Sequence, residues 1–130
     1  MDKPELAQQA LACYDRLLQR DQRLRPRPGQ RLMAEQVAQT FSQADLGPLE
    51  ASQALPGVEP QRALAVIQAG TGVGKSLAYC APALALALER NTRVLISTAT
   101  VALQEQLVHK DLPALVAQFE QPIRYALAKG

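Results

Sequence analysis

A glycine-rich turn between an apolar run and a helical pattern restricts the fold of this chain more than any other feature. The turn reads Ala69-Gly70-Thr71-Gly72-Val73-Gly74-Lys75-Ser76. It follows the apolar residues 63–67 and precedes a long segment rich in Ala and Leu. Strand, glycine-rich turn and helix in this order are typical of a phosphate-binding P-loop, which tolerates Ala69 in place of its first glycine. The alternative is a flexible glycine turn with a chance lysine.

Each part of the turn has a chemical role in a P-loop. The three glycines allow positive φ and a close approach of the backbone to an anion. Successive N–H groups, with the positive end of the following helix, can then hold a β-phosphate. Lys75 would reach the β- and γ-phosphates, and the Ser76 hydroxyl would bind Mg²⁺. The sequence therefore predicts a Mg²⁺-dependent nucleotide site formed by residues 69–76.

Composition limits the remaining possibilities. The chain has 130 residues, enough for one small domain with a core, and its 48% apolar but 4% aromatic content predicts an aliphatic core. The net charge of +2 says little about partners. Six arginines gather in one stretch: Arg16, Arg20, Arg23, Arg25, Arg27 and Arg31. This stretch either meets phosphates or is a solvated helix end.

The two cysteines and the apolar runs indicate a cytoplasmic protein. Cys13 and Cys80 lie in apolar helical patterns without metal-ligand spacing, so we expect buried free thiols. No signal peptide is visible at the acidic, Gln-rich N-terminus. The longest apolar run, residues 77–88, is too short to span a bilayer. We expect no membrane association.

Hydrophobic periodicity and breaker residues predict an α/β fold. Helices are expected at residues 4–20, 30–41, 76–90, 101–110 and 113–120. Strands are expected at residues 63–68, 93–97 and 123–127. Residues 44–60 read as a loop, with one helical turn at 49–55. Strand, P-loop, helix and strand make a right-handed βαβ unit, so the sequence predicts a parallel sheet with flanking helices.

A carboxylate that hydrolysis requires is missing. A P-loop enzyme needs an acidic residue at the end of a neighbouring strand, to hold the Mg²⁺ shell and place water. The strand ending at Ser97 is followed by Thr98-Ala99-Thr100, while Glu105 lies within a helix and Asp111 beyond one. We therefore expect this chain to be the front part of a larger enzyme, with no turnover by itself.

Residues 27–33, 69–76 and 97–107 form three motifs along the chain. In this order they resemble the motifs of the superfamily 2 DNA helicases of the DinG type, relatives of the XPD helicases. The P-loop resembles helicase motif I, and residues 97–107 resemble motif Ia. Ahead of them, residues 27–33 look like the adenine-reading Q-motif, and the match runs from about residue 25 to 130. The resemblance implies a RecA-like fold, with an incomplete first motor lobe preceded by an N-terminal helical segment. It divides the chain into N-terminal helices with the Q-motif (1–43), a linker or insertion (44–62) and a partial ATP-binding lobe (63–130).

The resemblance also implies roles at matching positions. Gln30 would read the adenine of ATP, because an amide offers a donor and an acceptor together, and Arg27 would assist it. Thr98, Thr100 and Gln104 would contact the backbone of single-stranded DNA. The expected partner is single-stranded DNA, or duplex DNA with a single-stranded tail. The family carries a 4Fe–4S cluster, an Asp-Glu-x-His box and a second motor lobe; Cys13 and Cys80 do not match the cluster positions.

Two other functions stay open from the residues alone. The chain could belong to a P-loop ATPase or kinase unrelated to nucleic acid. It could also be a degenerate nucleotide-binding remnant without catalysis. The hydroxyl residues of the motif Ia segment have a simpler alternative role too, because Ser97, Thr98 or Thr100 could cap the following helix.

Overall fold

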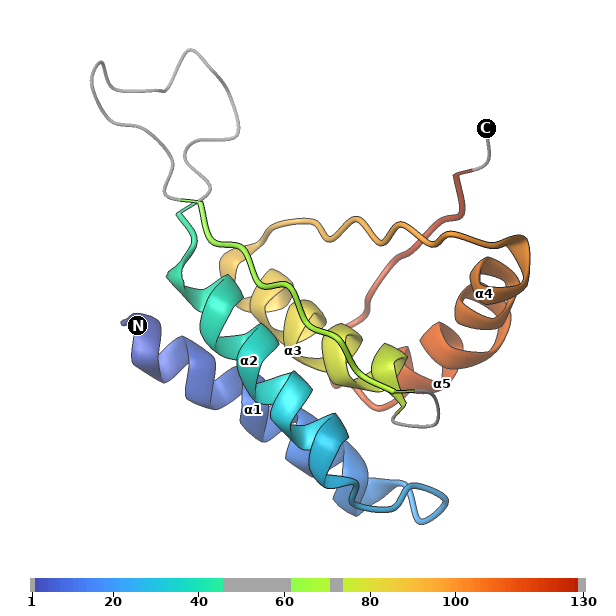
Figure 1. Cartoon of the computed structure of the whole chain (residues 1–130), viewed down its shortest axis with the longest axis horizontal. Coiled ribbons are helices and arrows are strands. Elements are labelled where there is room, and N and C mark those ends of the chain that lie inside the picture. The colour runs from blue at the N-terminus through green and yellow to red at the C-terminus, as the bar shows by residue number, and fades with distance from the viewer. Residues whose placement is uncertain (1, 46–61, 71–73, 129–130) are drawn as a thin grey trace.

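Three long helices form the body of the molecule. The computed structural model describes residues 2–45, 62–70 and 74–128. Helices α1 (Lys3–Arg20), α2 (Pro28–Gln43) and α3 (Lys75–Arg90) pack against one another in all three pairings (Figure 1). A second helical stretch follows, made of α4 (Val101–Gln106), the π-helix η2 (Leu107–Asp111) and α5 (Leu112–Val116). None of the helices described is long and apolar enough to cross a membrane.

Local signals determine where α1 begins and which face it buries. The Asp2 side chain accepts a hydrogen bond from the Glu5 backbone N–H at 2.9 Å, which satisfies one of the unpaired donors at the helix start. Five side chains at helical spacing are buried against the other helices: Leu6, Ala10, Cys13, Tyr14 and Leu17. The helix predicted over residues 4–20 is confirmed.

Helix α2 begins earlier than the sequence predicts. The sequence predicts a helix over residues 30–41, but α2 begins at Pro28. Proline suits the first helical position, since its fixed φ is already helical and it has no N–H to leave unpaired. Gln30 therefore lies in the first turn of α2, where it is buried.

Small side chains on α3 allow the three helices to pack closely. Ala78, Ala81 and Cys80 are almost fully buried in the main core cluster, with Tyr14 and Leu17 of α1 and Ala34 of α2. Cys13 and Cys80 are free and buried, as predicted. Helix α3 contains Pro82 in its interior and ends at Arg90, and the next residue, Asn91, adopts a left-handed conformation.

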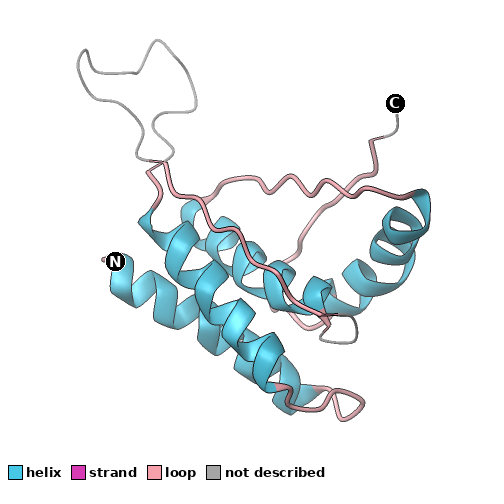
Figure 2. Cartoon of the chain, viewed as in Figure 1, coloured by secondary structure: helices cyan, strands magenta, loops and turns pink. Residues whose placement is uncertain are grey.

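The parallel sheet predicted from the sequence is not formed by the residues described. Residues 62–70, 92–98 and 121–128 carry the three expected strands, but no residue in them is assigned to a strand (Figure 2). In the described part of the chain, no backbone hydrogen bond joins any two of these segments. A strand needs the N–H and C=O groups of a neighbour, and apolar content alone does not supply them.

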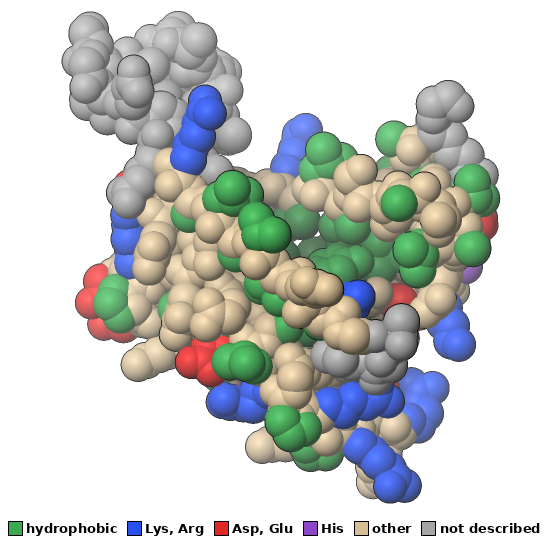
Figure 3. All heavy atoms as spheres, viewed as in Figure 1, with side chains coloured by type: hydrophobic (Ala, Val, Ile, Leu, Met, Phe, Trp, Pro, Cys, Tyr) green, Lys and Arg blue, Asp and Glu red, His purple; other side chains and the backbone are tan. Residues whose placement is uncertain are grey.

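The three segments nevertheless keep features of strands. Along residues 62–70 exposure alternates from residue to residue, so that Ala65 and Ile67 are half-buried while Leu64 and Val66 are exposed. Segments 92–98 and 121–128 line a cavity of about 820 Å³ with α3 and α5, and Figure 3 shows a hollow with apolar side chains in its wall. These segments therefore have one face on the helices and one face in solvent.

Residues 101–116 form one helical stretch with a widened turn, where two separate helices were predicted. Pro113 has no N–H, and its ring would clash with the carbonyl of the residue four positions earlier. The chain widens just before it: the Leu112 N–H donates to the carbonyl of Leu107, five residues back. The last helix ends at Val116, four residues earlier than predicted. The helical turn predicted at residues 49–55 lies outside the described residues, as does most of the linker 44–62.

Candidate nucleotide site

The start of α3 faces a cavity of about 690 Å³, a size typical of ligand sites. Gly70, Gly74, Lys75 and Ser76 of the predicted P-loop line it, and Gln30 reaches it from α2. Ala69 lies half-buried beside Gly70, while Thr71, Gly72 and Val73 lie outside the described residues. The structure thus brings the two ends of the predicted loop and the predicted adenine-reading residue to one place.

Gly74 has a conformation that requires glycine. Its φ is 82° and its ψ is 53°, in the left-handed region that side chains rarely adopt. A Cβ added here would collide with Nε2 of Gln30. At Gly70, in contrast, a Cβ would meet no atom within 4 Å. Gly74 therefore lets the backbone and the Gln30 amide approach each other closely at the beginning of α3.

Gln30 joins this turn to α1. Its Oε1 accepts a hydrogen bond from the Tyr14 hydroxyl at 2.6 Å, and its Nε2 donates to the Gly74 carbonyl at 3.0 Å. Gln30 is 5% exposed and Tyr14 is 0% exposed. The Arg27 guanidinium also lies beside Gly74, 3.5 Å from the position a Cβ would take there. Arg27 and Gln30 are therefore neighbours of Gly74, although Gly74 lies 44 residues after Gln30 in the sequence.

Lys75 and Ser76 have the surroundings that a phosphate and its metal ion need. Lys75 is exposed, lines the cavity and forms no ion pair with any residue described. Ser76 is half-buried and interacts with the Tyr79 hydroxyl. Burial raises the pKa of Tyr79. The hydrogen bond with Ser76 acts in the opposite direction, but its effect is smaller. With the glycine turn beside them, these residues fit a phosphate and Mg²⁺.

The arginine-rich stretch borders the site instead of forming a separate surface. Arg23, Arg25 and Arg27 line the same cavity as Lys75, and Figure 3 shows basic side chains gathered over the loop between α1 and α2. Other members are held by the chain itself. Arg31 forms two hydrogen bonds of 3.1 Å with Asp15, and Arg20 donates to the Gln118 carbonyl at 3.0 Å.

Of the motif Ia segment, Leu103 and Gln106 line this cavity, but the three residues predicted to contact DNA do not. The Thr100 hydroxyl accepts from the Leu103 N–H at 3.2 Å and so caps α4, the simpler role considered for it. Thr98 and Gln104 line the separate cavity of about 820 Å³, which the C-terminal half of α3 also lines. Their predicted contacts with DNA are not tested by this arrangement.

Two residues near the site were missed by sequence reasoning. Tyr14 lies within the helix predicted over residues 4–20 and received no role from the sequence, although a buried phenol usually has a polar partner. Asp111 was expected to lie beyond a helix and away from the site, but it lines this cavity.

Burial raises the pKa of the Cys80 thiol to about 12, and the negative charge of Asp111 adds to the effect. Among the residues described, no cluster of three His, Cys, Asp or Glu side chains could hold a metal ion.

Known proteins similar to this chain are helicases. The family model of DEAD/DEAH box helicases matches residues 50–122. The ATP-dependent DNA helicase DinG of Photobacterium profundum is 39% identical over 119 residues, which cover 91% of this chain and 15% of that protein. The ATP-dependent helicase DinG of Mycobacterium tuberculosis is 52% identical over 69 residues, which cover 50% of this chain and 10% of that protein.

A third relative has the same description. The ATP-dependent DNA helicase DinG of Salmonella choleraesuis is 39% identical over 105 residues, covering 81% of this chain and 12% of that protein. The chain thus spans 10% to 15% of the length of these relatives. No solved structure is significantly similar to it.

Proposed function

Because this chain belongs to the DEAD/DEAH box helicase family and has DinG-type helicases among its relatives, we propose that it binds Mg-ATP at residues 69–76 as part of a DNA helicase motor. Family membership implies a P-loop NTPase fold. The observation that carries the proposal is the left-handed Gly74 directly before Lys75, at the beginning of α3 and in the wall of a large cavity. Such a turn presents backbone N–H groups and a lysine to phosphate.

In this proposal, each residue of the site contacts a different part of the nucleotide. Lys75 neutralises the β- and γ-phosphates, and the Ser76 hydroxyl takes one ligand position on Mg²⁺. The metal ion supplies charge neutralisation between the phosphate oxygens. Gln30 reads adenine with the hydrogen-bonding groups that its two existing bonds leave unused. These are the second lone pair of the amide oxygen and the second hydrogen of the amide nitrogen. Arg27, beside Gly74, assists it.

We also propose the arrangement of the whole motor. Residues 1–43 form the helical segment with the Q-motif, 44–62 a linker or insertion, and 63–130 the first part of a RecA-like lobe. Thr98, Thr100 and Gln104 contact single-stranded DNA, or the single-stranded tail of a duplex, when the sheet is complete. The 4Fe–4S cluster of the family would then be held by residues outside this chain.

The nucleotide proposal is tested by calorimetric titration of the 130-residue chain with Mg-ATP. We expect weak binding that Lys75→Ala removes, since each lost charged hydrogen bond costs about 1.5–3 kcal/mol. Lys110→Ala is the matched control: it removes the same charge from another exposed lysine, outside the cavity. Equal affinities for the wild type and Lys75→Ala would refute the proposal and favour a degenerate remnant.

The helicase proposal has a separate test. We expect no ATP hydrolysis by this chain, because it has no acidic residue after its predicted strands. A longer protein containing it should hydrolyse ATP, and single-stranded DNA should accelerate that hydrolysis. If single-stranded DNA leaves the rate of ATP hydrolysis unchanged, the result would instead favour a P-loop ATPase or kinase unrelated to nucleic acid.

A further inference from the structure

A buried relay of two hydrogen bonds connects α1 to the N-terminal end of the phosphate-binding helix. Tyr14 of α1 donates to Gln30 of α2 at 2.6 Å, and Gln30 donates to the Gly74 carbonyl at 3.0 Å. Tyr14 and Gln30 are both shielded from water. Buried hydrogen bonds are costly to leave unmade, so this relay resists displacement.

The chemistry of the three groups determines the orientation of the Gln30 amide. The Gly74 carbonyl can only accept, so the amide nitrogen must face it. The amide oxygen then faces Tyr14, whose hydroxyl is the donor that it needs. Without the hydroxyl, the oxygen would be buried without this partner, and the amide would lose the contact that holds it against Gly74.

The Gly74 carbonyl in turn orients the peptide that enters α3. In a trans peptide the C=O and the following N–H lie in one plane and point in opposite directions. The Gly74 oxygen accepts from Gln30 Nε2 at 3.0 Å and from the Ala78 N–H within the helix at 3.4 Å. Together these two bonds hold the oxygen and so direct the Lys75 N–H the opposite way. This N–H is one of the donors at the start of α3 that have no partner within the helix.

We propose that Tyr14 is a positioning residue of the phosphate site, acting through Gln30 and Gly74 to hold the peptide that carries the Lys75 N–H. This inference rests on the proposed nucleotide binding at residues 69–76. It assigns Tyr14 an effect on phosphate that does not depend on the base, because the relay ends at the backbone of the turn. Any adenine contact by Gln30 is additional.

The test compares ATP with tripolyphosphate, which has no base, in calorimetric titrations of the 130-residue chain. Tyr14→Phe removes one hydroxyl and keeps the aromatic ring. We expect it to weaken the binding of tripolyphosphate and of ATP by the same factor, several-fold. Tyr14→Phe added to Gln30→Ala should have no further effect on tripolyphosphate, since the relay is already broken. Cys13→Ala is the matched control, because it removes buried atoms from the same helix and leaves the relay intact.

A second measurement needs no ligand. Hydrogen–deuterium exchange of residues 74–78 should become faster in Tyr14→Phe and stay unchanged in Cys13→Ala, each compared with global stability from urea unfolding. The inference is overturned if Tyr14→Phe leaves tripolyphosphate affinity unchanged, or if the Tyr14 and Gln30 effects multiply. If the wild type binds neither ligand, the proposed nucleotide site fails and this inference fails with it.

Discussion

Lys75 and Arg23 line the same cavity but differ in how much of their charge is available. Asp21 accepts three hydrogen bonds of 3.0 Å from Arg23, which lower the pKa of Asp21 and raise that of Arg23. Lys75 has no such carboxylate among the residues described. A phosphate entering the cavity would therefore meet Lys75 without first displacing an acidic partner.

Because of Cys80, the chain should become less stable at alkaline pH. Burial and the Asp111 charge raise its pKa from 9.0 to about 12. Because the folded thiol holds its proton more tightly than the unfolded one, this stabilisation is present below pH 9 and is lost as the pH rises toward about 12. The free energy of unfolding should fall by up to about 1.4 kcal/mol per pH unit in that window.

Urea unfolding at several pH values between about 8 and 11 measures this dependence. The comparison is with Cys80→Ala. The informative quantity is the slope of its free energy of unfolding with pH, because the substitution also changes the absolute stability. Tyr14, Tyr79 and Cys13 also have raised pKa values, mainly through burial, so some slope should persist in the variant. Identical slopes in the two proteins would contradict the assignment of this effect to Cys80.

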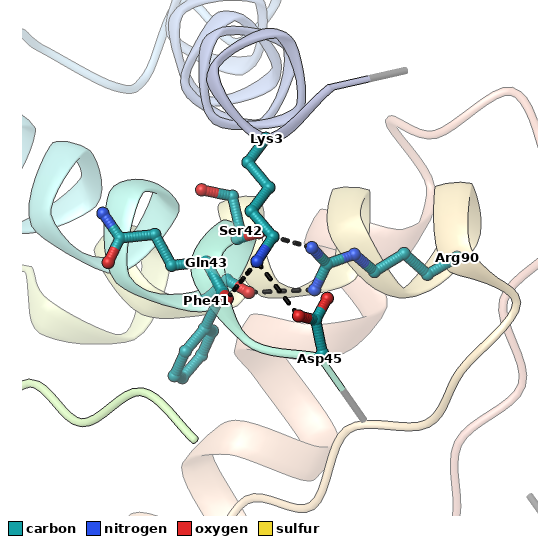
Figure 4. Close-up of polar contacts among 6 residues, drawn as sticks. All are labelled: Lys3, Phe41, Ser42, Gln43, Asp45 and Arg90. Atoms are coloured by element: carbon teal, nitrogen blue, oxygen red, sulfur yellow. Dashed lines mark hydrogen bonds and ion pairs between the residues drawn. The ribbon is translucent and has the colours of Figure 1, made fainter. Parts of the chain in front are cut away.

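The C-terminal end of α2 is held by side chains from the two other long helices (Figure 4). Arg90 at the end of α3 donates to the Phe41 carbonyl at 2.9 Å and to the Ser42 carbonyl at 2.5 Å. Lys3 at the start of α1 donates to the Gln43 carbonyl at 2.9 Å and pairs with Asp45 at 3.1 Å. These donors satisfy carbonyls of the last turn of α2, and at Phe41 they add to the 3.3 Å hydrogen bond that its carbonyl accepts from the Ala44 N–H.

Arg90→Ala should lower the free energy of unfolding by roughly 1–2 kcal/mol, because two carbonyls lose charged donors. Arg90→Lys should recover part of the loss, since an ammonium lacks the planar fork that reaches both oxygens. Arg93→Ala, at an exposed arginine just beyond the helix, is the control and should change little. Thermal or urea unfolding provides the measurement, and equal stability of both alanine variants would refute this role.

Considered as a whole, the molecule has a well-packed helical side and an incomplete opposite side. Leu64, Val66 and Leu95 are 88%, 91% and 93% exposed. Ile96, next to Leu95, packs against the main core cluster instead. The two neighbours thus lie in opposite environments, as adjacent residues of an extended segment do.

This difference predicts opposite results for the same substitution. Leu95→Lys should change the stability of the 130-residue chain by no more than about 0.5 kcal/mol, as surface substitutions usually do. Ile96→Lys should cost more, because it brings an ammonium against the core. Urea unfolding compares the two. A large loss in Leu95→Lys would mean that a partner layer, or a second copy of the chain, covers that face.

The helices could be predicted from the sequence and the sheet could not, for a physical reason. Caps, prolines and apolar spacing near α1 and α3 act within a few residues, so they can be read locally. Strand pairing depends on distant segments, and the three segments predicted as strands lack partners in the described residues. At the candidate site, the glycine pattern predicted a tight turn before α3, and Gly74 has the left-handed conformation of such a turn. The contact between Tyr14 and Gln30 depends instead on how α1 packs on α2.

The order in which the helices meet has a consequence for how the site is assembled. Helices α1 and α2 are joined by residues 21–27, so their contact closes a short loop and forms at little entropic cost. Helix α3 must close a much longer one, and contacts between distant residues form more slowly. The Gly74 carbonyl meets Gln30 only when α3 has docked on that pair. Capture of a phosphate ligand during refolding would therefore report the last step of assembly, after most of the helical signal has returned.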